Sequence, residues 1–149
     1  MQQGLNKVIL VDDDIDDRDM FAEAFEDLKV KAELLLFEDA QKFIEYLAKI
    51  ERHLPTYVFL DLNMPVLSGM DCLKMLREKL EINDIFITIY STSSSQHDIE
   101  TAYLNGANGY LKKPTSFHEL KDLIRKAIMA GFSNNGKQLK KEEFVLNDN

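Results

Sequence analysis

Four short apolar runs of this chain each end in polar or charged residues, and this pattern restricts what the chain can fold into. The runs are residues 8–11, 57–60, 85–90 and 110–111, and the residues that follow them are Asp12 and Asp13, Asp61, Ser91 and Thr92, and Lys112 and Lys113. Continuous apolar runs of this length are typical of strands that are buried on both faces. If the four runs are neighbouring parallel strands, these side chains meet at the carboxyl edge of one sheet, where open α/β sheets bind ligands.

The segments between the runs have the spacing of amphipathic helices. Helices are predicted after the first run to about residue 28, at about 40–47, at 70–79, from the serines at 93–95 to about 104, and from 116 through 128. Asp39 is a plausible N-cap, and Ser116 with Glu119 forms a capping box. Residues 32–37 read as a weaker strand. The chain therefore contains five βα units, whose right-handed crossovers predict a parallel sheet covered by helices on both faces.

The length and composition fit one globular domain followed by a short tail. The chain has 149 residues, of which 45% are hydrophobic and 30% charged, as in an ordinary domain with a core. We expect the domain to cover residues 1–131. Residues 132–149 are polar, with one apolar cluster at 144–146, and we expect them to be a mostly flexible extension whose removal leaves the fold intact.

Several classes of protein are excluded or disfavoured. No apolar run approaches the roughly 20 residues that a membrane span needs, and the first seven residues lack the pattern of a signal peptide. One cysteine, Cys72, permits neither an internal disulfide nor a cysteine-based metal cluster. The net charge of −8 argues against a nucleic-acid partner. We therefore expect a cytoplasmic protein that binds neither nucleic acid nor membrane.

The adjacent acids at the end of the first run suggest a cation site. Asp12 and Asp13 directly follow a buried run, and two carboxylates in this position raise each other's pKa unless a cation offsets them. A hard divalent cation with oxygen ligands is the simplest remedy. The acids further on, Asp16, Asp17 and Asp19, are expected to be a solvated helix start, where negative charge is mildly favourable.

Two other motifs overlap with these acids. Asp12, Asp14 and Asp16 imitate a calcium-binding loop, but Asp17 stands where the sharp turn needs glycine, and a strand precedes the acids instead of a helix. Asp12 and Asp14 also imitate the nucleophile motif of haloacid-dehalogenase-like phosphatases. Those enzymes need a hydroxyl or small apolar residue where this chain has Asp16, so the phosphatase remains only as the enzyme alternative.

The combined set resembles a known family. Asp12-Asp13, Asp61 within Leu-Asp-Leu-Asn-Met-Pro, Ser91-Thr92, and Gly-Ala-Asn-Gly-Tyr-Leu-Lys-Lys-Pro at 106–114 resemble the receiver domain of two-component response regulators. The resemblance covers roughly residues 7–130 and is closest to stand-alone, chemotaxis-regulator-like receivers. It implies a doubly wound, flavodoxin-like fold with strand order 2-1-3-4-5.

The resemblance also implies a role for each matching residue. It makes Asp61 the phosphoacceptor, Lys113 the lysine that contacts the phosphoryl group, Ser91 the hydroxyl switch and Tyr110 the aromatic switch. It implies that Mg²⁺, or Mn²⁺ in its place, is held by Asp13, Asp61 and the backbone carbonyl of Asn63, with Asp12 acting through a bound water. The chemistry agrees, because a cation and a lysine neutralise the charge that develops when a carboxylate attacks a phosphoryl group.

The implied function is a phosphorelay switch rather than an enzyme. The donor would be a histidine kinase or a histidine phosphotransfer protein, the reader an unidentified downstream protein or a second copy of the chain, and the only turnover slow self-dephosphorylation. One alternative is a phosphate shuttle or sink with no output of its own. Another is a purely structural interaction domain, which the complete set of acids, hydroxyl and lysine disfavours.

Overall fold

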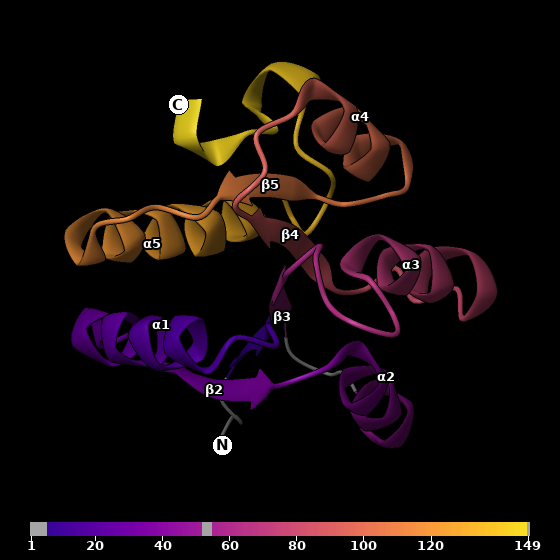
Figure 1. Cartoon of the computed structure of the whole chain (residues 1–149), viewed down its shortest axis with the longest axis horizontal. Helices are drawn as coiled ribbons and strands as arrows, with labels where there is room; N and C mark the ends of the chain where they lie inside the picture. Colours follow the sequence, from indigo (N-terminus) through magenta and orange to yellow (C-terminus); the bar gives the residue numbers. More distant parts are fainter. Residues whose placement is uncertain (1–5, 52–54, 149) are drawn as a thin grey trace.

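Strands and helices alternate along the chain, as the sequence predicted. The computed structural model describes residues 6–51 and 55–148; residues 1–5, which belong to the segment that lacks signal-peptide features, lie outside these ranges, as do 52–54 and 149. The strands are β1 (Asn6–Val11), β2 (Ala32–Phe37), β3 (Thr56–Leu60), β4 (Phe86–Ser91) and β5 (Gly109–Lys112). The α-helices are α1 (Ile15–Leu28), α2 (Ala40–Lys49), α3 (Gly69–Lys74), α4 (Gln96–Leu104) and α5 (Phe117–Ser133), shown in Figure 1.

The five strands form one parallel sheet in the order β2-β1-β3-β4-β5. This confirms the predicted doubly wound topology and its strand order. The register pairs Val11 with Leu60 and Ser91 with Lys112, so β1 and β3 end level with each other, as do β4 and β5. Leu60 pairs with Ile89, so β4 extends two residues beyond the end of β3. Polar residues that follow the strands are therefore delivered to one edge of the sheet.

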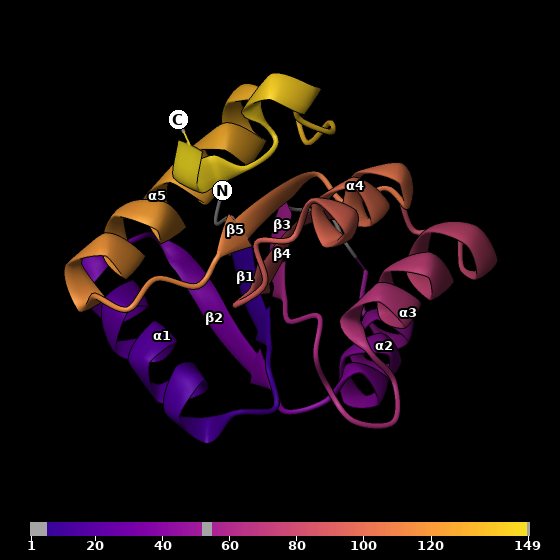
Figure 2. The ribbon, with the colours of Figure 1, turned by 45° about the horizontal axis from the view of Figure 1, so that its top comes forward.

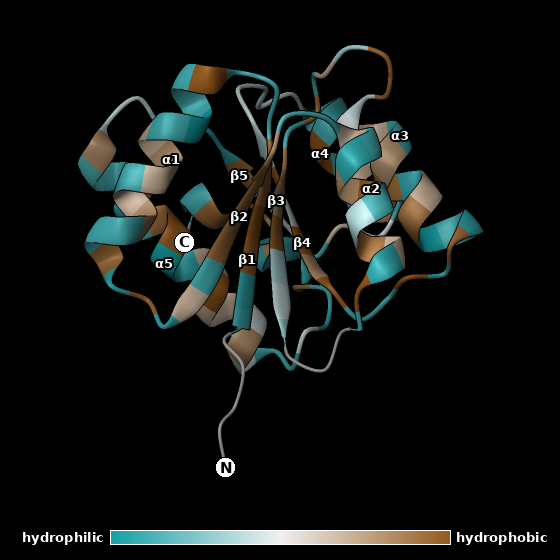
Figure 3. Ribbon diagram, turned by 90° about the horizontal axis from the view of Figure 1, so that it is seen from below, coloured by the Kyte–Doolittle hydropathy of each residue, from teal (hydrophilic) through white to brown (hydrophobic). Residues whose placement is uncertain are grey.

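Helices cover both faces of the sheet. Figures 2 and 3 show α1 and α5 on one face and α2, α3 and α4 on the other. Successive strand residues point to opposite faces, and β1 illustrates this: Leu10 belongs to the apolar cluster of Phe21 in α1 and Ile124 in α5, whereas Ile9 belongs to that of Phe43 in α2. Burial on both faces explains why the central strands are continuous apolar runs.

Each of the five α-helices of the described residues begins at a polar cap. The side chains of Asp14, Asp39, Ser68, Ser95 and Ser116 each accept a hydrogen bond from the backbone N–H three residues further on. These bonds satisfy donors that a helix leaves free at its N-terminus. The predicted caps at Asp39 and Ser116 are confirmed.

The third predicted helix ends differently from the expectation. It is an α-helix to Lys74 and then a π-helical turn over Met75–Lys79. Arg77 lies in this turn, and its guanidinium donates to the carbonyl oxygen of Gly106 at 3.0 Å and to Asn108 Oδ1 at 2.7 Å. The turn therefore ties the end of the helix to the segment that leads into β5.

The C-terminal segment is packed on the domain, which corrects the expectation of a flexible tail at 132–149. Leu139, Phe144 and Leu146 are buried, and Val145 forms a parallel bridge with Tyr110 of β5. In Figure 1 the segment lies beside β5 and α4. The packing of the segment depends on tertiary contacts that the sequence pattern does not reveal. Its few apolar residues show no periodicity, but they cover apolar surface at the edge of the sheet.

Candidate functional site

The predicted site residues meet at the carboxyl edge of the sheet. Asp12 and Asp61 directly follow the paired strands β1 and β3, and the Asp61 N–H donates to the Val11 carbonyl at 3.0 Å. Ser91 is the last residue of β4, and its carbonyl accepts from the Lys113 N–H at 2.7 Å. The backbone ladder itself therefore positions acids, hydroxyl and lysine at neighbouring strand ends.

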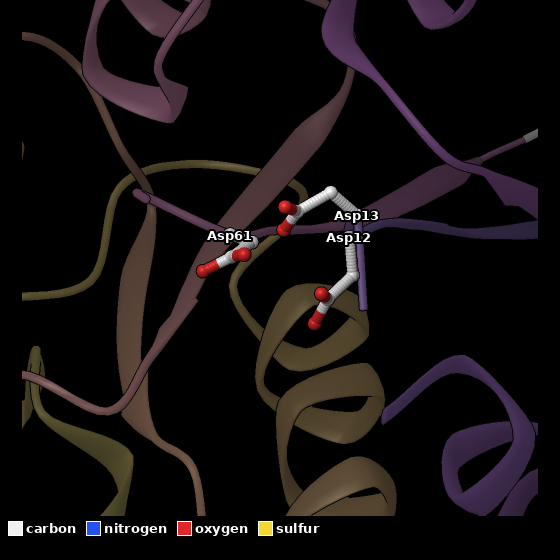
Figure 4. A group of neighbouring side chains, drawn as sticks. All are labelled: Asp12, Asp13 and Asp61. Atoms are coloured by element: carbon white, nitrogen blue, oxygen red, sulfur yellow. The ribbon is translucent and has the colours of Figure 1, made fainter. Parts of the chain in front are cut away.

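Three carboxylates form a cluster with the spacing of a cation site. Oxygen atoms of Asp12, Asp13 and Asp61 all lie within 4.8 Å of one another. Figure 4 shows the carboxyl groups of Asp13 and Asp61 turned toward each other, with that of Asp12 beside them. Asp12 and Asp61 are buried, at 0% and 5% exposure, whereas Asp13 is open to solvent.

The environment of Asp61 disfavours a bare carboxylate. The pKa of Asp61 is raised to about 7, chiefly by burial and further by repulsion from Asp12 and Asp13, against the lowering effect of the Lys113 charge. Burial also raises the pKa of Asp12, against the lowering effects of Lys113 and of the Asp14 N–H. A divalent cation placed in this cluster would favour the charged form of Asp12 and of Asp61.

The surroundings of the buried Asp12 carboxylate indicate whether a cation would fit this cluster. Asp12 Oδ1 accepts a hydrogen bond from the Asp14 N–H at 3.0 Å. Asp12 Oδ2 is fully buried and has no hydrogen bond of acceptable geometry within the described part of the chain, although Lys113 Nζ lies 2.8 Å away. A buried acceptor that is left partly unsatisfied is costly. The donor set is all oxygen, so Mg²⁺ and Mn²⁺ fit the site.

Lys113 joins the acids by two close ion pairs and one longer one. Its Nζ lies 2.8 Å from Asp12 Oδ2, 2.8 Å from Asp17 Oδ2 and 3.6 Å from Asp61 Oδ1. Burial alone lowers the pKa of Lys113, but the attraction of the Asp12 and Asp17 carboxylates outweighs it and raises the pKa above its usual value. The Nζ also lies 5.1 Å from the centre of the buried Tyr90 ring, in cation–π range.

The contacts of Lys113 with Asp17 and with Tyr90 were not predicted from the sequence. Asp17 was grouped with the solvated helix-start acids, yet it pairs with Lys113 across 96 positions of the chain. Tyr90 precedes the hydroxyl residue Ser91 and looks like a core aromatic, which it also is. Conversely, Asp14 of the acidic run is the N-cap of α1 and accepts from the Asp17 N–H at 3.0 Å, outside the carboxylate cluster.

The hydroxyl and the aromatic residue are linked through Ser93. The buried Ser91 Oγ accepts from the Ser93 N–H at 3.1 Å, and the Tyr110 hydroxyl donates to the Ser93 carbonyl at 2.8 Å. Tyr110 is fully buried. The two residues that the sequence marked as switches are therefore separated by one shared neighbour.

The loop after Asp61 is held tightly by Gly69. The Gly69 N–H donates to the Leu62 carbonyl at 2.9 Å, and a Cβ at Gly69 would lie 2.0 Å from the Asp61 carbonyl oxygen. Any side chain here would force the acidic loop to move. The Asn63 N–H approaches Asp61 Oδ1 at 3.4 Å, so Asn63 stands beside the phosphoacceptor candidate.

The carboxyl edge thus brings together Asp12, Asp13, Asp61 and Lys113, with Ser91 at the next strand end. Tyr110 is linked to Ser91 through Ser93. The arrangement combines a buried carboxylate, a cluster of carboxylate oxygens that could hold a cation, and a positive charge held between them. Those are the parts required for metal-assisted phosphoryl transfer to a carboxylate.

Comparisons with known proteins agree with this reading. Residues 8–125 match the family described as the response regulator receiver domain. The probable methanogenesis regulatory protein FilR2 of Methanothrix harundinacea is 32% identical over 120 residues, which cover 78% of this chain and 77% of that protein. Several other curated relatives are longer, and the chain covers between 11% and 47% of three of them.

Solved structures show the same fold. The response regulator RPA3017, in red light signaling of R. palustris, is 28% identical with a TM-score of 0.74, covering 92% of this chain and 99% of that one. The Mn²⁺-bound form of the response regulator Rcp1 is 21% identical with a TM-score of 0.69, covering 85% of this chain and 93% of that one. Among the described residues of the present chain, no helix is long and apolar enough to cross a membrane.

Proposed function

Because the chain belongs to the response regulator receiver family, we propose that it accepts a phosphoryl group on Asp61 and transmits this event to a protein surface. A receiver is a signalling domain and not a catalytic enzyme family. The donor in this proposal is a phosphohistidine, on a histidine kinase or a histidine phosphotransfer protein. The observation that carries the proposal is the buried Asp61 carboxylate, which lies between two further acids and the Lys113 ammonium.

The transfer step follows from these groups. A carboxylate oxygen of Asp61 bonds to phosphorus while the bond from phosphorus to the donor nitrogen breaks, and that nitrogen keeps the electron pair. Lys113 Nζ lies 3.6 Å from Asp61 Oδ1, close enough to form an ion pair with an oxygen of a phosphoryl group on Asp61. Slow hydrolysis of the resulting acyl phosphate is the only turnover that we expect.

The cation in the proposal is Mg²⁺, or Mn²⁺ in its place. Its ligands would be the carboxylates of Asp13 and Asp61 and the backbone carbonyl of Asn63, with Asp12 acting through a water. When bound, it neutralises charge on the acids and on the incoming phosphoryl oxygens. Support comes from the spacing of the three carboxylates and from the buried Asp12 Oδ2, which is ion-paired with Lys113 but accepts no hydrogen bond within the described residues. The response regulator Rcp1, which shares this fold, has been solved in a Mn²⁺-bound form.

We predict that labelling by acetyl phosphate requires the cation. Excess chelator should abolish labelling, and added Mg²⁺ or Mn²⁺ should restore it, as measured by the intact mass of the protein. Asp13→Asn should raise the Mg²⁺ dissociation constant about tenfold or more, because even an outer-shell partner of a metal ligand typically contributes that much. Asp14→Asn is the matched control, since Asp14 caps α1 instead of joining the cluster.

Two results would contradict this part of the proposal. Labelling at full rate in excess chelator would remove the metal from the mechanism. A larger loss of Mg²⁺ affinity in the Asp14 variant would move the ligand by one residue.

The signal would leave through the surface formed by α4, β5 and α5. Recruitment of the Ser91 hydroxyl by a phosphoryl oxygen would rotate the Oγ that now accepts from Ser93, whose carbonyl holds Tyr110. Tyr110 lies on β5 and is buried beneath that surface. We propose that a downstream protein or a second copy of the chain reads this change, with a coupling free energy on the order of 1–3 kcal/mol.

A shuttle or sink uses the same chemistry without the last step. It differs from the switch in one observable, because a phosphoryl mimic would then alter the site without altering the α4–β5–α5 surface. The experiment on the C-terminal segment below separates the two readings.

A further inference from the structure

Asp17 holds the catalytic lysine in a position that the proposed function does not explain. The Asp17 and Asp12 carboxylates both lie 2.8 Å from Lys113 Nζ, whereas the phosphoacceptor lies 3.6 Å away. The Lys113 side chain is only 10% exposed, so the contacts of its ammonium are largely confined to this pocket. Lys113 in the resting protein is therefore paired more closely with its two anchors than with Asp61.

We propose that Asp17 is a positioning residue that draws Lys113 away from Asp61 until a phosphoryl group competes for it; this rests on the proposed function and deepens it. An ammonium on Asp61 would occupy the carboxylate that the cation needs. Asp17 lowers this competition and adds negative charge near the cation site. Both effects favour cation binding in the resting state.

The same residue opposes the phosphorylated state. The phosphoryl group brings further negative charge toward Asp17, and Lys113 must leave or share the Asp17 contact to reach a phosphoryl oxygen. Removal of the Asp17 charge should therefore weaken cation binding and strengthen phosphoryl binding. Opposite changes in the two affinities are expected if Asp17 competes with the phosphoryl group for Lys113. A general loosening of the pocket would instead weaken the binding of both the cation and the phosphoryl group.

The chain supplies a matched control in the neighbouring residue. Asp16 and Asp17 both lie in the first turn of α1, so each carries the same charge close to the same helix terminus. Asp16 is exposed and belongs to none of the ion pairs of the site within the described ranges. The Asp17 backbone N–H, and not its side chain, bonds to the Asp14 cap, so Asp17→Asn leaves the cap intact.

The test measures two dissociation constants by calorimetry on the full chain. In Asp17→Asn, the constant for Mg²⁺ should rise and that for beryllofluoride at saturating Mg²⁺ should fall, each about two- to fivefold, the size expected of a partly exposed ion pair. Asp16→Asn should change both by less than half as much. Equal effects in the two variants, or weakening of both ligands in Asp17→Asn, would overturn the inference. Failure of the unaltered protein to bind beryllofluoride would instead overturn the proposed function.

A second inference rests on different residues, namely the C-terminal segment 137–148. Phe144 is buried against Tyr103 of α4, with ring centres 5.1 Å apart, and against Tyr110 of β5, at 6.4 Å. The Tyr110 N–H donates to the Phe144 carbonyl at 2.9 Å. The residue that would move in the switch therefore touches this segment with both its ring and its backbone.

Further bonds continue the pairing along the outer edge of β5. Asn147 accepts from the Lys112 N–H at 2.8 Å and donates to the Lys112 carbonyl at 3.0 Å. Lys126 of α5 donates to the Leu146 carbonyl at 2.6 Å. The segment thus occupies backbone groups of an edge strand that would otherwise be open to pairing with another chain.

We infer that residues 137–148 occupy the output surface in the resting state and are loosened when Tyr110 moves; this too rests on the proposed function. Loosening would free the Tyr110 and Lys112 backbone groups and uncover the apolar site of Phe144. The partner that fits such a surface is an extended segment that pairs in parallel with β5, with an aromatic residue at the place of Phe144 and a carboxamide at that of Asn147.

Hydrogen exchange on the full chain tests this, with and without beryllofluoride and Mg²⁺. The amides of Tyr110 and Lys112 should exchange about fivefold faster or more with the mimic, the lower end of typical allosteric coupling. Asp61→Asn under the same conditions is the control and should show no change. Unchanged or slower exchange at these two amides, with altered amides around Asp61, would overturn the inference and favour the phosphate sink. No change at any amide would count against the proposed function itself.

Discussion

Asp61→Asn should abolish labelling by acetyl phosphate and by a phosphohistidine donor. The amide has almost the shape of the carboxylate but lacks the nucleophilic oxygen, and no other acid of the cluster is placed in the same way. Asp12 is buried and bound to the Asp14 N–H and Lys113, whereas Asp13 is exposed. Intact-mass measurement after incubation with Mg²⁺ and acetyl phosphate gives the readout. Undiminished labelling of the variant would move the acceptor to another residue.

The variant should be folded, and its stability provides an internal control. The pKa of Asp61 is raised to about 7 by burial, so the folded protein binds this proton more tightly than the unfolded chain, where the usual value is 3.8. The stabilisation that this gives is complete below about pH 4 and is lost as the pH rises toward 7. Without metal, Asp61→Asn should therefore lose less stability than the unaltered protein over this range, as measured by urea unfolding at several pH values.

The sequence predicts the sheet well because the sheet is built from local patterns. The residues of β3 are all buried, and a strand covered on both faces must be apolar throughout. The strand β2 at the edge is half-exposed along its length, which explains its weaker pattern. The polar residues at strand ends follow from the same logic, since topology alone brings Asp12, Asp61 and Lys113 together.

Features that depend on contacts between distant parts of the chain could not be predicted from the sequence. Asp16 and Asp17 are neighbouring acids in one helical turn, and nothing local tells which of them faces a lysine 96 positions away. The same holds for the C-terminal segment, in which Phe144 packs against Tyr103 and Tyr110, more than thirty positions before it. A period is visible only where one element presents a face, and this segment instead uses single residues such as Phe144.

Phe144→Ala should lower the free energy of unfolding by about 3 kcal/mol, the lower end of the cost of deleting a buried aromatic ring. Phe144 is 1% exposed and fills the space between Tyr103 and Tyr110. Phe132 is the matched control, because it is an aromatic residue near the same end of the chain but is 74% exposed. Its replacement by alanine should change stability by no more than about 0.5 kcal/mol.

Urea unfolding of the two variants separates a packed segment from a flexible tail. A flexible tail predicts that both substitutions are nearly neutral and that removal of the segment leaves the domain intact. A packed segment predicts a large loss for Phe144→Ala alone, since the cavity would open next to the fully buried Tyr110. A large loss of stability in Phe144→Ala alone would also show that the segment covering Tyr110 contributes to the stability of the domain. A partner that competes for β5 would then have to replace the buried ring as well as the backbone bonds.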